Sequence, residues 1–313
     1  MTTVNETHAM TDTATPSSNS TTTDPKTHVT EHKNHRLTLG GVIRSEWIKA
    51  MSLRSIRWTM AISIGLGVAM CVVMGFALND LFNDPTSPMT ATEYVLAVTT
   101  FPATFLAFVF GVLGAFVFSS EYASGMILST LTAAPRRGYV VAAKALVLTA
   151  ISAAAAFIVV GAGIAVSVLY MPGVADVLGS TQVLTGMLGT VFFLVAISLF
   201  AFAVAGIVRS TAGAITVVIG ILLLVPMILQ IMSGVLDWNW LVTIQNYLPM
   251  TLGSNLGIGV TDAAELSLRV QMEQADTGYA EVLSYGDSAF NLALWVIVPM
   301  AVAVRLFFSR DAK

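Results

Sequence analysis

Six long apolar runs constrain the fold of this chain more than any other feature of its 313 residues. Each run is about 20 residues or longer, which is enough to cross about 30 Å of hydrocarbon as an α-helix. The chain is 56% hydrophobic and only 11% charged, with a mean hydropathy of +0.80, so an ordinary soluble domain is excluded. The sequence predicts an all-α integral membrane protein with spans at about 58–78, 95–118, 139–170, 183–207, 211–233 and 288–308.

The basic residues fix the predicted orientation of these six spans. Fourteen of the 15 Lys and Arg residues fall before span one, after spans two and four, or at the C-terminal end. The opposite side has only Arg269, together with eleven acidic residues. Because cytoplasmic segments are enriched in Lys and Arg, we expect a multi-pass protein of the cell membrane with both termini in the cytoplasm.

The first 36 residues differ in composition from the rest of the chain. They are rich in Ser and Thr and contain almost no large apolar side chain, which predicts a disordered cytoplasmic tail before a transmembrane domain at 37–313. His28 and His32 have the i, i+4 spacing of a metal pair. No cysteine or predicted helix accompanies them, so no metal site is expected.

An interfacial helix is predicted between the tail and the first span. Leu39, Ile43, Trp47 and Met51 recur every four residues and form an apolar stripe, whereas Glu46 and Lys49 lie off it. Such a helix lies along a membrane surface with its basic groups near lipid phosphates. The functional candidates in this region are Glu46, Trp47, Lys49 and Arg54.

A short polar segment separates spans two and three and has its own helical pattern. Met126, Ile127, Leu128 and Leu131 form an apolar stripe that Pro135 closes, which predicts a short amphipathic helix on the cytoplasmic surface. Such a helix can dock on a soluble partner. The alternative is an ordinary cytoplasmic loop whose arginines only set the topology.

The charged candidates of this segment are Glu121, Arg136, Arg137 and Lys144. Lys144 lies near the start of the third apolar run, which is longer than a span requires. We expect its ammonium group to reach the lipid headgroups along its flexible stem.

The segment from 234 to 287 is the longest predicted connection and lies on the outer side. Trp238 and Trp240 suit a membrane interface. The following apolar stretch is shorter than a span and contains Pro249, Gly253 and Gly257, which predicts short re-entrant or outer-leaflet helices. The residues from Ala263 to Leu283 are predicted to form a surface helix with an acidic cap.

Two further features concern helix packing. Small residues four apart, at Gly65 and Ala69, at Gly111 and Ala115, and at Gly161 and Ala165, predict close contacts between helices of the bundle or of a dimer. Pro226 predicts a kink in the outer half of the fifth span.

Several chemistries are absent from the sequence. No phosphate-binding loop of the type G-x-x-x-x-G-K-[ST], no zinc-ligand spacing and no Ser/His/Asp set occurs, so we expect no enzyme and no cofactor in this chain. The span interiors lack ionisable groups of the kind that bind coupling ions, which disfavours an ion-driven carrier. The energy for any transport would therefore come from a partner.

Two stretches resemble one family of transporters. The pattern E-Y-x-S-G-M-I-x-x-T-L, then P-R-R and then K, from Glu121 to Lys144, resembles the bacterial ATP-binding-cassette (ABC) type 2 permeases. The string SEWIKAMSLRSIRW, residues 45–58, looks like the N-terminal entry of a branch of that family. With the short outer helices before the last span, the resemblance covers about residues 37–308.

The resemblance implies a role for the segment between spans two and three. It would be the cytoplasmic coupling helix that docks on an ABC ATPase subunit, which holds ATP and Mg. The matching residues are Glu121, Tyr122, Ser124, Gly125, Arg136, Arg137 and Lys144. The family also implies a homodimer or heterodimer of permeases in the lipid bilayer, without nucleic acid, exporting an amphipathic substrate along spans one, two and five. The alternative is a non-transporting assembly factor or sensor, which an adjacent ATPase gene would disfavour.

The predicted topology is tested by two cysteine substitutions. We expect Ser284→Cys to react with an impermeant thiol reagent in intact cells, because this residue lies on the outer side, and Ser210→Cys to stay unlabelled. The unsubstituted protein, with its single Cys71, is the control. Labelling in the reverse order would contradict an orientation with both termini inside.

Overall fold

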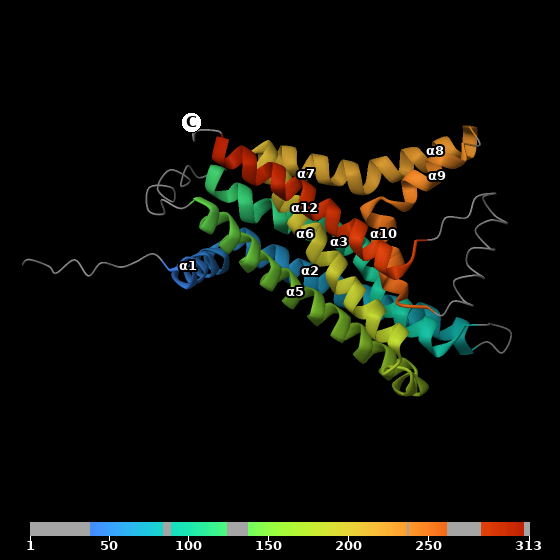
Figure 1. The fold of residues 1–313 in the computed structure, drawn as a ribbon. Coiled ribbons are helices and arrows are strands. Elements are labelled where there is room, and N and C mark those ends of the chain that lie inside the picture. Colours follow the sequence, from blue (N-terminus) through green and yellow to red (C-terminus); the bar gives the residue numbers. More distant parts are fainter. Residues whose placement is uncertain (1–37, 84–88, 124–136, 237, 262–282, 310–313) are drawn as a thin grey trace, which may run out of the picture. The chain divides into compact units, whose positions relative to one another are not determined.

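The computed structural model describes residues 38–83, 89–123, 137–236, 238–261 and 283–309, all within the unit Leu37–Lys313 (Figure 1). These residues form helices and connecting turns, and no strand occurs among them. The predicted tail, most of the predicted coupling helix and the acidic outer segment lie outside the described residues. The all-α fold class is confirmed.

Within the described residues, six helical segments are long and apolar enough to cross a membrane, as the sequence predicts. They are α2 (Arg54–Asn83), α3 (Ala91–Ala123), α5 (Arg137–Tyr170), α6 (Thr181–Val208), the continuous run of α7 (Thr211–Ile219), η2 (Gly220–Leu224) and α8 (Val225–Leu236), and α12 (Tyr285–Ser309). The candidate spans begin and end within about four residues of the predicted limits. A short 3-10 helix, η1 (Pro172–Asp176), connects α5 to α6.

Helix α6 is the central element of the bundle. It contacts α3, α5, α7, α10 and α12, and most of its side chains are buried (Figure 1). An aromatic cluster ties three spans together at one end, where the ring of Phe118 in α3 packs edge-to-face against Phe202 of α6 and Phe307 of α12. Because apolar lipid supplies little hydrophobic driving force between helices, such close packing is a main source of bundle stability.

The fifth span changes its hydrogen-bond pattern in the middle. The π-helical turn η2 ends just before Pro226, and the backbone N–H of Val225 donates to the carbonyl of Gly220, five residues earlier. A proline donates no backbone hydrogen bond, so the ladder is weakened at the position where the sequence predicts a kink. None of the residues of α8 is buried within the described structure.

Two short helices lie in the described part of the predicted outer segment, between residues 238 and 261. They are α9 (Asn239–Asn246) and α10 (Pro249–Ile258). Helix α10 packs against α6, α12 and α3 with Leu252 and Leu256 fully buried, whereas Trp238 and Trp240 are exposed and stack with their ring centroids 5.8 Å apart. The depth of both helices in a membrane stays a prediction.

Glycines permit the close approach of α10 to α6. A Cβ atom added at Gly189 would lie 2.5 Å from the carbonyl oxygen of Leu256, and one added at Gly186 would lie 2.7 Å from that of Gly257. The predicted small-residue positions behave differently: a Cβ at Gly111 would meet Val218 at 3.0 Å, but Gly65 and Gly161 face open space within the described chain. These close contacts lie at glycines that the sequence analysis did not select, as does Gly114 of α3, where an added Cβ atom would clash with the Ser198 carbonyl of α6.

We expect Gly189→Ala to destabilise the bundle by about 1–3 kcal/mol, because α6 and α10 must separate to accept the methyl group. Gly161→Ala is the matched control, since it adds the same methyl group to open space in α5. The measurement is the thermal unfolding midpoint of each variant in one detergent. Equal midpoints for the two variants would contradict the proposed close contact.

Candidate functional site

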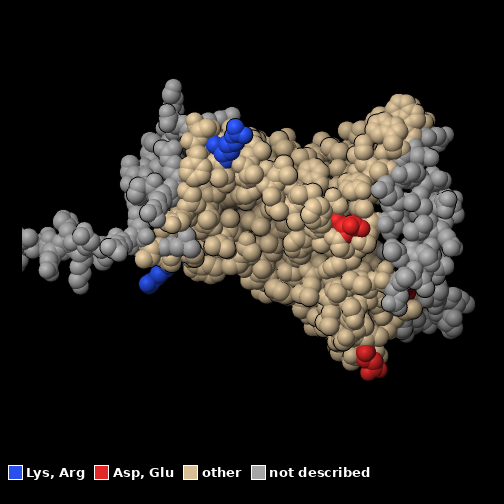
Figure 2. Space-filling model, viewed as in Figure 1, with Lys and Arg blue, Asp and Glu red and all other residues tan. Residues whose placement is uncertain are grey.

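Charged side chains divide the described bundle into two ends. Figure 2 shows Lys and Arg at one end and Asp and Glu at the other. The first end, here called the basic end, is formed by α1, the starts of α2, α5 and α7, and the ends of α3, α6 and α12. Its described basic residues are Arg44, Lys49, Arg54, Arg57, Lys144, Arg209 and Arg305.

The opposite end has the described side chains of Glu93, Asp176 and Asp287. Two of these residues lie at helix N-termini: Glu93 is in the first turn of α3, and Asp287 is in the first turn of α12. Ser210 and Ser284, the two residues of the labelling test, also lie at opposite ends of the bundle. Ser210 caps α7 next to Arg209, and the Ser284 hydroxyl donates to Asp287 at 2.6 Å.

Helix α1 (Leu39–Ser52) lies at the basic end and forms the first part of the site. The hydroxyl oxygen of Thr38 caps it by accepting from the Gly41 N–H at 3.3 Å. Leu53 has extended backbone angles and separates α1 from α2. This break allows α1 to turn away from the first span and to pack mainly against α5.

The orientation of α1 corrects one prediction. The sequence analysis placed Glu46 off the apolar stripe that includes Trp47, but Glu46 is only 4% exposed, whereas Trp47 is 43% exposed. The buried face of α1 consists of Val42, Glu46 and Ala50, which are spaced four residues apart. A carboxylate therefore occupies the centre of the buried face of α1.

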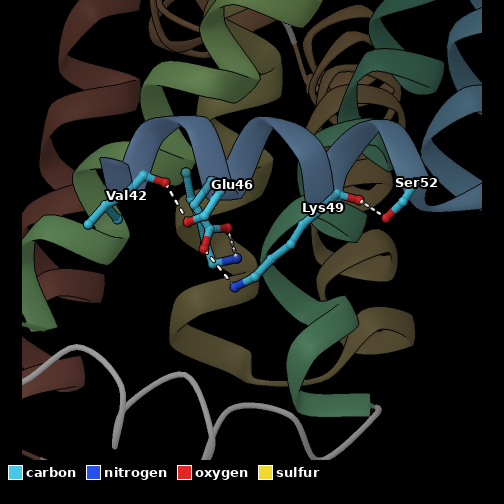
Figure 3. Close-up of polar contacts among 6 residues, drawn as sticks. Val42, Glu46, Lys49 and Ser52 are labelled. Carbon is cyan, nitrogen blue, oxygen red and sulfur yellow. Dashed lines mark hydrogen bonds and ion pairs between the residues drawn. The ribbon is translucent and has the colours of Figure 1, made fainter. Parts of the chain in front are cut away.

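Lys144 of α5 explains this orientation. Its ammonium group lies 2.6 Å from one carboxylate oxygen of Glu46, and Lys49 donates to the other oxygen at 2.8 Å. Figure 3 shows the Glu46 side chain on the inner side of α1, with the Lys49 side chain reaching it. The expectation that Lys144 extends to the lipid headgroups is wrong, because its side chain is only 9% exposed and is held under α1.

The two lysines keep Glu46 ionised. Burial by itself raises the pKa of the Glu46 carboxyl, but the charge of Lys144 and the hydrogen bonds from Lys144 and Lys49 outweigh that effect and lower the pKa below its ordinary value of 4.5. At neutral pH the contact is thus an ion pair. Removing one member of such a buried pair leaves an uncompensated charge, which typically costs about 3–5 kcal/mol.

The other predicted site residues have a mixed outcome. Glu121 and Tyr122 lie in the last turn of α3, and Arg137 is the first residue of α5, so these three flank the predicted coupling helix. Ser124, Gly125 and Arg136 lie outside the described residues. Arg54 is an exposed residue at the start of α2.

The sequence analysis selected Glu46 and Lys144 as separate candidates and missed their contact. The available signal was that Glu46 shares a four-residue spacing with Val42 and Ala50. The ion pair therefore joins α1 to the start of α5, although its two residues are 98 positions apart in the sequence. No group of three potential metal ligands occurs among the residues that the structure describes.

The length and composition of the helices indicate the class of protein. Six helices of membrane-spanning length and composition make the chain a multi-pass membrane protein. No protein-family model matches the chain, and no match was found among curated proteins.

We expect Glu46→Leu to destabilise the docking of α1 by about 3–5 kcal/mol, because it removes the carboxylate that compensates the buried charge of Lys144. Lys144→Met should cost less, because Lys49 still binds the other oxygen of Glu46. The double variant Glu46→Leu, Lys144→Met should recover much of the loss, since an apolar pair of similar volume fills the same space. The measurement is a double-mutant cycle on unfolding in detergent. Additive losses in the double variant would contradict a direct, buried ion pair.

Proposed function

We propose that this chain is the permease subunit of an ATP-driven exporter of the ABC type 2 class. It works as a dimer in the cell membrane with both termini in the cytoplasm. Two separate ATPase subunits bind ATP and Mg and supply the energy. The cargo is amphipathic, because the spans offer apolar surfaces and few charges.

One observation carries this proposal. The two stretches that resemble the type 2 permeases contribute one member each to the buried ion pair: Glu46 comes from the N-terminal string, and Lys144 is the last residue of the coupling pattern. Two patterns read independently from the sequence therefore share one contact. A chance resemblance of either stretch would give no reason for that contact.

The position of the ion pair also suits a transmission role. Helix α1 lies across the start of α5, and the segment proposed as the coupling helix connects α3 to that same start. A push on this segment by an ATPase would act on α5 near Lys144. The ion pair would make α1 move together with the start of α5. Without this link, the start of α5 could shift alone and leave α1 in place.

The charge distribution supports the proposed orientation. The described basic side chains gather at the end that holds α1 and the start of α5 (Figure 2). In the positive-inside arrangement this end faces the cytoplasm, where a soluble ATPase can reach it.

Affinity purification tests the partner. The tagged full-length chain is extracted from its native membranes in mild detergent, and the co-purified proteins are identified by mass spectrometry. We expect an ATPase with a phosphate-binding loop in near-stoichiometric amount. Purification without any such ATPase would favour an assembly factor or sensor.

Coupling is tested by removing charges on both sides of the proposed coupling helix. We expect Glu121→Ala with Arg136→Ala to keep normal membrane abundance, since charge pairs on a protein surface generally contribute at most about 1 kcal/mol to stability. Export by the reconstituted complex should fall to background, because the helix no longer engages the ATPase. Abundance, ATP hydrolysis and export are measured on the same preparation.

The control for this prediction is Arg57→Ala with Arg305→Ala, which removes two exposed charges at the basic end but outside the coupling segment. This variant should export at the wild-type rate. Wild-type export by the Glu121 and Arg136 variant would show that the segment is a topological loop only.

A further inference from the structure

A cleft of about 200 Å³ lies between α3, α6 and α10, and its lining residues on α3, from Ala97 to Thr104, belong to the half of that span that begins at Ala91. Figure 1 shows α10 beside α6 and α3 in this part of the bundle. The residues that line the cleft have no ionisable side chain. Four of them carry hydroxyl groups, and aromatic and aliphatic side chains form the remaining wall. The hydroxyl residues are Thr100, Thr104, Thr190 and Ser254.

Two of these hydroxyls have a fixed hydrogen-bonding direction. The Thr100 hydroxyl donates to the Leu96 carbonyl at 2.7 Å, and the Thr190 hydroxyl donates to the Gly186 carbonyl at 2.9 Å. Each hydroxyl has a single proton, so its oxygen is left with lone pairs only. Toward the cleft, both oxygens can therefore accept hydrogen bonds but cannot donate them.

Gly257 of α10 lies beside both oxygens. A Cβ atom added at Gly257 of α10 would lie 3.3 Å from the Thr100 Oγ1 and 3.6 Å from the Thr190 Oγ1. The two acceptors thus border the same small space, which Gly257 leaves open. A methyl group at this position would fill that space.

We propose that the cleft binds an uncharged amphipathic ligand whose head donates hydrogen bonds, such as a primary amide or an alcohol. The head lies against Thr100 and Thr190, and its apolar part packs along Phe101 and Met250. A charged head is disfavoured, because an unpaired charge at this depth of a membrane is costly.

The size of the cleft limits what it holds. Its volume corresponds to roughly seven water molecules, so it accepts a head group and the first few carbons of a chain. Phe101 and Thr104 are exposed at its edge, so a longer tail can continue along the outer surface of α3. This inference goes beyond the proposed export function, because binding requires neither an ATPase nor transport.

Photolabelling of the purified full-length chain in lipid nanodiscs tests the proposal. The probe is decanamide with a diazirine on its alkyl chain, and labelled peptides are mapped by mass spectrometry. We expect saturable labelling of segments 97–104 and 250–258. Unlabelled decanamide should compete, and N,N-dimethyldecanamide, which has no N–H donor, should compete about three- to tenfold more weakly, as for the loss of one hydrogen bond.

Two variants with matched controls locate the site. Gly257→Ala should reduce saturable labelling about tenfold, whereas Gly161→Ala, which faces open space in α5, should not. Thr100→Val removes one of the two acceptors and should weaken the preference for the primary amide. Thr149→Val is its control, since Thr149 makes the same bond to its own helix, to the Ala145 carbonyl, outside the cleft.

Three results would overturn the proposal. The first is labelling that does not saturate and spreads over exposed residues such as Leu188. The second is equal competition by the two amides. The third is an unchanged amide preference in Thr100→Val, which tests the site even if Gly257→Ala lowers the unfolding midpoint. Since no ATPase is present, each result is independent of the proposed export function.

Discussion

The requirement that polar groups be paired wherever water is excluded shapes most of this structure. It favours helices for the six long apolar segments, because a helix satisfies its own backbone. The buried hydroxyl of Ser288 is an exception, because it has no hydrogen-bond partner among the described residues. Seven other hydroxyls that are buried within the described spans donate to the carbonyl four residues earlier in their own helix. These residues are Ser63, Thr99, Ser119, Ser152, Ser167, Thr190 and Ser198. Polar side chains are thereby accommodated without a partner from another helix.

The same requirement explains which features were predictable from the sequence. Span limits depend on length and hydropathy, which are local properties, and the six predicted spans agree with the structure. The face of α1 that packs inward was not predictable in this way, because α1 has apolar residues on two sides. Val42 and Ala50 are buried, whereas Trp47 and Ile48 are exposed. The spacing of Val42, Glu46 and Ala50 marks a second possible inner face. The choice between the two faces depends on Lys144, 98 positions after Glu46, and the pattern within α1 cannot reveal that partner.

Contacts between helices were also only partly predictable from the sequence. A small residue marks a place where two backbones can approach, but the partner that uses it is non-local. Gly65 and Gly161 fit the expected spacing and face open space within the described chain. Gly189 makes a close approach because α10 returns toward α6 and places the Leu256 carbonyl against it. That return depends on residues after Pro249, so no window within α6 could reveal it.

The ion pair between Glu46 and Lys144 is a costly way to attach a helix, because both charges must be desolvated. An apolar pair would hold α1 as tightly, yet apolar contacts tolerate rotation and sliding of one helix over another. The bond from Lys144 of α5 to the Glu46 carboxylate favours the rotation of α1 that turns Glu46 toward α5, whereas Lys49 belongs to α1 itself and puts no limit on that rotation. This rotation keeps Trp47 and Ile48 on the outer surface, where a membrane interface can receive them. The buried charges thus contribute to how α1 is oriented against α5.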